Sequence, residues 1–293
     1  MRLIFKFLSL TLLVWLPATL SFAAKVDSLD IPSAAMHKTY KAGVVLPQTY
    51  AKSKAAYPVL YLLHGGSGHY SDWLQKTPDK QLLHKLADQY NLIIVTPEGE
   101  TLGGYLDSPV QPDNKFETYI TQEVITKIDN TYRTTRDRKG RVITGLSMGG
   151  HGALYLATRH PDLYYAAGSM SGALDLNFNN WKIAPEFAKE ITPRFARILG
   201  PIGTTPDLYA ANSVVYMADK MKTNEVKLIF DCGVDDFLIE PNRELHRRLV
   251  YNKVPHNYTE YPGGHTWDYW ENSLPYHLLF FHKILKANGV TVM

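Results

Sequence analysis

A ten-residue stretch near the middle of the chain, Arg141–Gly150, constrains the fold more than any other part of the sequence. It begins with a short β-branched run and continues into Gly145-Leu146-Ser147-Met148-Gly149, which fits the pattern G-x-S-x-G. In such an elbow a strand turns sharply into a helix, and the serine at the tip holds a strained backbone conformation. The flanking glycines are needed because a Cβ there would collide with the neighbouring strand and helix. The pattern predicts that the Ser147 hydroxyl points out of a sheet.

The residues after the elbow support a helix. Small and apolar residues recur at helical spacing, at Gly150, Ala153, Leu154 and Ala157. This stripe can pack the helix against a sheet, with its N-terminus directed at Ser147 and favourable to negative charge there. The alternative is a glycine-rich turn in which the serine only caps the helix.

The rest of the chain alternates between apolar strand-like runs and amphipathic segments. The expected strands are 38–46, 57–63, 92–95, 141–145, 163–170, 226–230 and 258–261, and the expected helices are 81–90, 115–132, 240–251 and 268–288. This alternation predicts an α/β fold with a mostly parallel central sheet and helices on both faces. Residues 173–225 break the rhythm and are expected to form a small helical insertion over the site. Without a repeat or a long linker, residues 24–293 are expected to form one domain.

The first residues have the pattern of a secretory signal peptide. Arg2 and Lys6 precede an apolar run from Leu8 to Leu20, and small residues lead to a cleavage site after Ala23. Residues 1–23 are therefore expected to direct export, so that the protein is secreted or periplasmic and is not inserted stably in a membrane after cleavage. The alternative is an uncleaved anchor, for which the apolar run is short.

Charge and cysteine content exclude several functions. Removal of residues 1–23 takes away two basic residues and no acidic one, which lowers the formal net charge from +3 to +1. A near-neutral protein without a basic run gives no reason to expect nucleic acid binding.

The one cysteine, Cys232, allows no intrachain disulfide and argues against a thiolate metal site. It is expected to be buried in a strand. His64 and His69 lie five residues apart on a glycine loop, which matches no metal-binding helix spacing. We expect no metal ion and no cofactor.

A serine nucleophile needs a histidine base and a carboxylate that orients it. In α/β-hydrolases these residues follow in the order Ser, Asp or Glu, His. His265 follows Gly263-Gly264 after the last expected strand and is the predicted base. The acid is Asp235 or Asp236, with Asp236 preferred because it stands three residues past the turn glycine. Ser171 also lies beside a glycine but lacks the G-x-S-x-G pattern.

The oxyanion of the tetrahedral intermediate needs two N–H donors. One is predicted to be the N–H of Met148, the residue after the nucleophile. The other is expected from Gly66 or Ser67, in the glycine loop that follows the buried strand 57–63. His64, at the start of this loop, is expected to brace it rather than to act in the chemistry.

Four motifs together resemble one known family. They are His64-Gly65-Gly66, Gly145-Leu146-Ser147-Met148-Gly149-Gly150, Cys232-Gly233-Val234-Asp235-Asp236-Phe237-Leu238 and Gly263-Gly264-His265-Thr266-Trp267. Over about residues 40–285, the chain is similar to the putative esterase family of α/β-hydrolases, and the resemblance implies the α/β-hydrolase fold. This family includes esterase D, tributyrin esterases and feruloyl or acetylxylan esterases, with the antigen 85 mycolyltransferases as relatives. The resemblance implies a carboxylesterase for short acyl groups with Ser147, Asp236 and His265 as the triad. Esterase D enzymes are cytosolic and act on a glutathione thioester, which does not fit an exported chain.

The expected function is therefore that of an exported serine carboxylesterase. Its substrate is expected to be a small-molecule or saccharide ester with a short acyl chain, such as an acetylated or feruloylated saccharide. One alternative is an acyltransferase that uses the same acyl-enzyme, and another is a non-catalytic binding protein on the same fold. Trp73, Trp181 and Trp267 could stack on a sugar or fill a core. The oligomeric state is not predicted.

Overall fold

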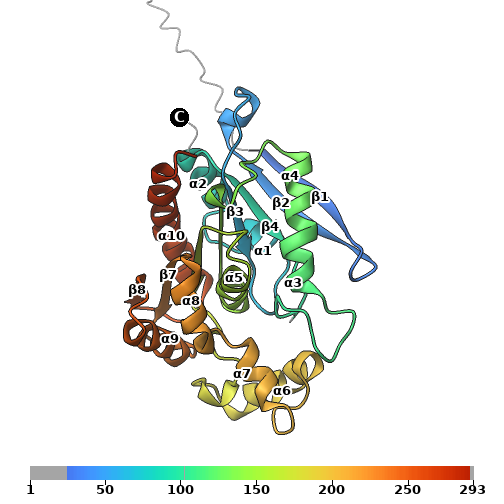
Figure 1. Ribbon diagram of the computed structural model, residues 1–293, viewed down its shortest axis with the longest axis vertical. Helices are drawn as coiled ribbons and strands as arrows, with labels where there is room; N and C mark the ends of the chain where they lie inside the picture. Colours follow the sequence, from blue (N-terminus) through green and yellow to red (C-terminus); the bar gives the residue numbers. More distant parts are fainter. Residues whose placement is uncertain (1–24, 102, 291–293) are drawn as a thin grey trace, which may run out of the picture.

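Eight strands form one sheet in the order β1-β2-β4-β3-β5-β6-β7-β8 (Figure 1). The computed structural model describes residues 25–101 and 103–290. In these residues β2 is antiparallel to β1 and β4, and the other neighbouring strands are parallel. The strands are β1 (Lys25–Ser33), β2 (Lys38–Leu46), β3 (Val59–Leu63), β4 (Ile93–Pro97), β5 (Arg141–Gly145), β6 (Ala166–Met170), β7 (Lys227–Gly233) and β8 (His256–Tyr261). The predicted mostly parallel sheet is confirmed.

Helices cover both faces of this sheet. The helices are α1 (Asp72–Gln75), α2 (Leu82–Tyr90), α3 (Phe116–Thr118), α4 (Ile125–Thr131), α5 (Met148–Arg159), α6 (Pro185–Leu199), α7 (Pro206–Asn212), α8 (Ala218–Asn224), α9 (Ile239–Tyr251) and α10 (Trp267–Ala287). Side chains of β3 alternate between two cores, with Tyr61 in the core beneath α5 and α9 and Leu62 in the core beneath α2 and α10. This explains why 57–63 is apolar throughout, since a strand covered on both faces has no polar side.

The expected helix 115–132 contains a feature that the sequence pattern did not predict. A π-helical turn, Tyr119–Val124, joins α3 to α4. Phe116, Ile120, Val124 and Ile128 recur every four residues, and all four are buried. A repeat of four exceeds the 3.6 residues of an α-helical turn. The wider turn, with its i→i+5 hydrogen bonds, keeps all four side chains against the core.

The first strand was also not predicted. β1 pairs with β2 along its whole length, with Leu29 opposite Ala42 and Ile31 opposite Tyr40. Its other face carries aspartate and serine, which have low β-propensity, so the segment looks weak when taken by itself. An edge strand with one polar face is stabilised by pairing with its neighbour rather than by its own composition.

The insertion, 173–225, is largely helical and contains α6, α7 and α8. In Figure 1, α6 and α7 lie at the lower end of the molecule. Phe178, just before α6, contacts Phe195 of α6 and Tyr209 of α7, with ring centroids 6.0 and 6.5 Å apart. These rings extend the core on this face of the sheet into the insertion.

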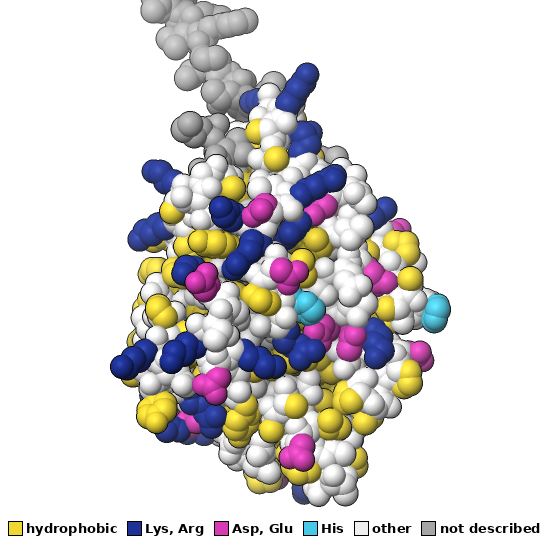
Figure 2. All heavy atoms as spheres, in the orientation of Figure 1, with side chains coloured by type: hydrophobic (Ala, Val, Ile, Leu, Met, Phe, Trp, Pro, Cys, Tyr) yellow, Lys and Arg dark blue, Asp and Glu magenta, His cyan; other side chains and the backbone are white. Residues whose placement is uncertain are grey.

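The surface shows no separation of charge on the face drawn in Figure 2, where basic and acidic side chains are interspersed. Within the described ranges, no helix has both the length and the apolar character needed to cross a membrane. The predicted signal peptide, residues 1–23, lies outside the described residues. Cys232 is buried in β7, as expected.

Candidate active site

Ser147 lies between β5 and α5 with φ 55° and ψ −119°. Few residues other than glycine adopt a positive φ, and such strain is concentrated at functional sites. A Cβ on Gly145 would lie 2.6 Å from the Gly149 backbone, and one on Gly149 would lie 2.5 Å from the His64 carbonyl oxygen. Only glycine fits at either position, so the predicted strand–turn–helix elbow is present for the predicted reason.

The structure brings the three predicted site residues together. The Nε2 atom of His265 lies 2.9 Å from Ser147 Oγ, and its Nδ1 atom lies 2.8 Å from Asp236 Oδ2. Ser147, Asp236 and His265 follow β5, β7 and β8, whose carboxyl ends meet at one edge of the parallel sheet. Asp235, the other carboxylate considered, is exposed to solvent, whereas Asp236 is only 2% exposed.

A close backbone contact joins the loops that carry Asp236 and His265. A Cβ on Gly233 would lie 2.2 Å from the Gly263 carbonyl oxygen, so the two loops pack without an intervening side chain. The Asp236 N–H donates to the Gly233 carbonyl, which closes a turn that directs the carboxylate toward the histidine. The other carboxylate oxygen, Oδ1, accepts a hydrogen bond from the Leu238 N–H at 2.8 Å. Both oxygens of the buried carboxylate are thus satisfied.

Two aromatic rings hold the His265 imidazole. The Phe237 ring centroid lies 4.5 Å from that of His265, and the Trp270 centroid lies 4.8 Å away with its ring perpendicular. These contacts and the Asp236 hydrogen bond restrict rotation of the imidazole. This role of Phe237 and Trp270 was not predicted from the sequence. Phe237 directly follows Asp236, and Trp270 lies in the helix that follows His265, so their positions along the chain could have indicated it.

The two predicted anion-binding segments lie beside Ser147. Met148 is the first residue of α5, so its N–H has no partner within the helix. The Gly65–Gly68 loop follows β3, and a Cβ on Gly65 would lie 3.5 Å from the Ser147 Cβ. Gly66 and Ser67 line the same pocket as Ser147 and Met148.

This pocket has a volume of about 280 Å³ and opens on Ser147 and His265. Part of its wall comes from one face of α6, with Phe187, Ile191 and Phe195 spaced by four residues. Trp181 and Trp267 also line the pocket. Trp73, the third tryptophan considered for sugar stacking, does not line the pocket. It is buried, and its indole N–H donates to the Leu63 carbonyl at 3.0 Å.

Cys232 and Ser171, two other side chains with nucleophilic atoms, are both buried. Burial, reinforced by the charges of Asp236 and Asp231, raises the pKa of the Cys232 thiol well above its usual range, so no reactive thiolate forms. Ser171 has a positive φ of 48°, but its side chain is completely buried. In the part of the chain that the structure describes, no three His, Cys, Asp or Glu side chains are placed to hold a metal ion.

Comparison with known proteins agrees with this geometry. The model of the family described as "Putative esterase" matches residues 33–281. An acetyl esterase of Caldicellulosiruptor saccharolyticus is 29% identical over 219 residues, which cover 72% of this chain and 78% of that protein. A solved ferulic acid esterase is 30% identical, with a TM-score of 0.74, and the match covers 90% of this chain and all of that one.

A more distant relative is an acyltransferase. The diacylglycerol acyltransferase/mycolyltransferase Ag85A of Mycobacterium gordonae is 31% identical over 159 residues, which cover 51% of this chain and 43% of that protein. The family match, by contrast, extends over most of the chain. The chain therefore belongs to the putative esterase family of α/β-hydrolases, and its enzymatic class is that of a serine carboxylic-ester hydrolase.

Proposed function

We propose that the protein hydrolyses short-chain acyl esters with Ser147 as nucleophile, His265 as general base and acid, and Asp236 as the group that orients His265. The observation that carries this proposal is the hydrogen-bonded series Asp236–His265–Ser147, which ends at the pocket. The N–H groups of Met148 and Gly66 are the proposed oxyanion donors. A protein that only bound its ligand would have no need of this series.

The reaction has two halves. Ser147 Oγ attacks the ester carbonyl carbon while His265 Nε2 takes the hydroxyl proton, and the carbonyl oxygen becomes an oxyanion held by the two N–H groups. The C–O bond to the alcohol then breaks, and His265 returns the proton to the departing oxygen. In the second half, His265 takes a proton from water, which attacks the acyl-enzyme, and collapse of the second oxyanion releases the acid and restores Ser147.

The shape and lining of the pocket support the proposed substrate class. A volume of about 280 Å³ leaves room for a short acyl group. Trp181 and Trp267 supply aromatic faces, which can stack on a sugar ring or on a feruloyl ring. The similarity to an acetyl esterase and a ferulic acid esterase supports an acetyl or a feruloyl ester as the substrate.

With p-nitrophenyl esters of increasing chain length, we expect kcat/KM to be highest for acetyl to butyryl esters and to fall for longer chains. The physical reason is that α6 closes the pocket with large side chains such as Ile191 and Phe195. Acetylated and feruloylated oligosaccharides assayed alongside would identify the alcohol. An optimum at long acyl chains would contradict the proposed acyl preference.

The second candidate function is acyl transfer to an alcohol. It is supported by the similarity of about half the chain to a mycolyltransferase. Both reactions use the same acyl-enzyme, and they differ only in whether water or an alcohol attacks it. Product analysis with a sugar or glycerol added in excess distinguishes them, because a transferase forms a new ester and a hydrolase forms only free acid.

We also propose that the protein is exported and processed after Ala23. The basic start, the apolar run and the small residues at the cleavage site support this proposal. When the full chain is expressed in a Gram-negative bacterium, we expect it in the periplasm or medium with Ala24 as its first residue, as read by mass spectrometry. An intact N-terminus on protein in the cytosol would contradict export.

A further inference from the structure

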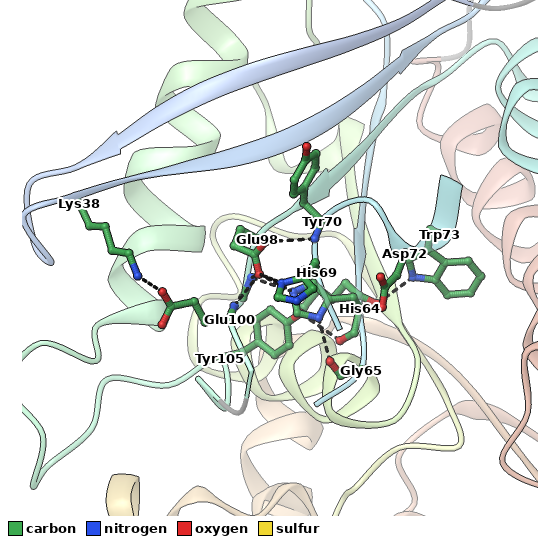
Figure 3. A network of polar contacts seen from close by, with 12 residues as sticks. Lys38, His64, Gly65, His69, Tyr70, Asp72, Trp73, Glu98, Glu100 and Tyr105 are labelled. Carbon is green, nitrogen blue, oxygen red and sulfur yellow. Dashed lines mark hydrogen bonds and ion pairs between the residues drawn. The ribbon is translucent and has the colours of Figure 1, made fainter. Parts of the chain in front are cut away.

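Three side chains surround the Gly65–Gly68 loop on the side away from substrate. They are His64 at the start of the loop, Glu98 just after β4 and Tyr105 in the segment that follows (Figure 3). All three are buried, and none of them lines the pocket that contains Ser147. The mechanism above uses none of these side chains.

Two of these side chains hold carbonyl oxygens of the loop. The Tyr105 hydroxyl donates to the His64 carbonyl at 2.9 Å. The Gly65 carbonyl accepts from His64 Nδ1 at 2.8 Å and from the Gly68 N–H at 3.0 Å. A trans peptide is planar, with its C=O and N–H pointing in opposite directions. The bonds to the Gly65 carbonyl therefore also set the direction of the Gly66 N–H, which has no hydrogen-bond partner among the described residues.

The His64 ring is itself held in one tautomer. Its Nε2 atom accepts the Gly99 N–H at 2.8 Å, so that nitrogen carries a lone pair and the proton lies on Nδ1. This is the tautomer that can donate to the Gly65 carbonyl. The hydrogen bond from the Gly99 N–H to Nε2 thus determines that Nδ1, the nitrogen that contacts the Gly65 carbonyl, carries the proton. In histidines generally, the partner of one ring nitrogen sets the protonation of the other.

Glu98 in turn holds the peptide that contacts His64. Its Oε1 atom accepts the N–H groups of Gly99 and Glu100 at 3.2 and 2.8 Å, and its Oε2 atom accepts the Tyr70 N–H at 3.2 Å (Figure 3). The carboxylate therefore ties the turn after β4 to the segment that follows the glycine loop.

The ionisation of these groups favours a fixed arrangement. Burial opposes the charged form of Glu98, but the hydrogen bonds from the Tyr70 and Glu100 N–H groups favour it and keep the pKa of this carboxyl below its usual range. Burial, with a smaller contribution from the charge of Glu98, raises the pKa of the Tyr105 hydroxyl well above its usual range. Near neutral pH, Glu98 is therefore always an acceptor and Tyr105 always a donor.

We propose that Glu98, His64 and Tyr105 form an oxyanion brace, a set of positioning residues that aim the Gly66 N–H at the oxyanion. The brace rests on the proposed function, in which Gly66 is an oxyanion donor. It contacts only the protein, yet a donor displaced by about 1 Å can cost about 100-fold in rate, because hydrogen bonds to the oxyanion depend steeply on geometry. The brace therefore acts on the transition state more than on substrate binding.

Tyr105→Phe and Glu98→Ala test the brace, with Glu98→Gln as the conservative variant. Active sites are counted with a fluorophosphonate, and kcat/KM per site is measured together with the inhibition constant of a trifluoromethyl ketone, which forms an oxyanion adduct on the serine. We expect Tyr105→Phe and Glu98→Ala to lower kcat/KM by about 10- to 100-fold, mostly in kcat, and to weaken the ketone by a similar factor. Glu98→Gln retains one acceptor oxygen and should recover part of the loss.

Matched controls separate positioning from general stability. The Tyr209 hydroxyl is buried and donates to the Gly200 carbonyl at 2.9 Å, as Tyr105 does to His64, but it lies in the insertion. Glu117 is a buried carboxylate paired with Arg159 and His160, outside the pocket. Tyr209→Phe and Glu117→Gln can lower the melting temperature, but we expect their kcat/KM per site to stay within about twofold of the wild type.

The outcomes distinguish the brace from the proposed function. If the wild type is labelled and active but Tyr105→Phe and the Glu98 variants match the controls per site, the brace is wrong. It is also wrong if kcat/KM falls without weakening of the ketone. Tyr105→Phe removes a single hydroxyl and remains decisive if Glu98→Ala does not fold. If the fluorophosphonate does not label Ser147 in the wild type, the proposed function itself fails.

Discussion

Ser147→Ala is expected to lower kcat by roughly five to six orders of magnitude, the loss typical when a serine hydrolase loses its nucleophile. The hydroxyl is the atom that attacks the ester, and the His265 proton transfer has no function without it. The substitution removes one oxygen and leaves the 2.8 Å contact between His265 and Asp236 in place. Residual hydrolysis would come from the oxyanion donors and substrate binding alone. The measurement is kcat with a p-nitrophenyl ester, together with fluorophosphonate labelling.

The matched control for this prediction is Ser171→Ala. Ser171 is also a serine with a positive φ, 48° against 55° at Ser147, so the same substitution is made in both variants. It is buried away from the pocket, and we expect its variant to keep both labelling and turnover within several-fold of the wild type. Substantial turnover by Ser147→Ala, or a label attached to Ser171, would contradict the assignment of the nucleophile.

Asp236→Asn is expected to lower kcat by about 10⁴-fold with little change in folding. Asparagine has nearly the same shape, but its amide no longer stabilises a positively charged imidazole, and it favours the histidine tautomer that cannot accept the serine proton. The 2.8 Å distance between His265 Nδ1 and Asp236 Oδ2 is the contact that carries this effect. The measurement is kcat across pH 6–9, with thermal unfolding to confirm that the variant is folded.

Asp235→Asn provides the comparison, because it is the same substitution one residue away on an exposed side chain. We expect it to leave kcat almost unchanged. Equal losses for the two variants would mean that the loop, and not the hydrogen bond to His265, determines activity. A loss only in Asp235→Asn would reverse the assignment of the acid.

The elbow illustrates what local sequence can determine. No other residue can replace Gly145 or Gly149, because an added Cβ would lie less than 3 Å from backbone atoms. Such a steric requirement leaves the same pattern in every chain that forms this turn, so it can be recognised from the residues alone. The apolar run 57–63 was recognisable for a similar reason, since a strand buried on both faces admits few polar residues.

The edge strand β1 and the π-helical turn before α4 were not predicted, and neither depends on local preference. β1 is stabilised by its partner strand, and the π-helical turn by the core that Phe116, Ile120, Val124 and Ile128 enter together. The brace around the Gly65–Gly68 loop is a further example, because Glu98 and Tyr105 carry no motif. Their significance comes only from lying next to His64.

The sequence by itself determined the elbow, the alternation of strands and helices and the order of serine, aspartate and histidine, because each depends on residue type and spacing along the chain. It left open which of two adjacent aspartates faces His265 and which tryptophans reach the pocket. The tertiary structure decided both, placing Asp236 against the imidazole, Trp73 in the core and Trp181 at the pocket wall. These outcomes depend on the close packing of loops from different strands, and such contacts between distant segments are not encoded in any local pattern.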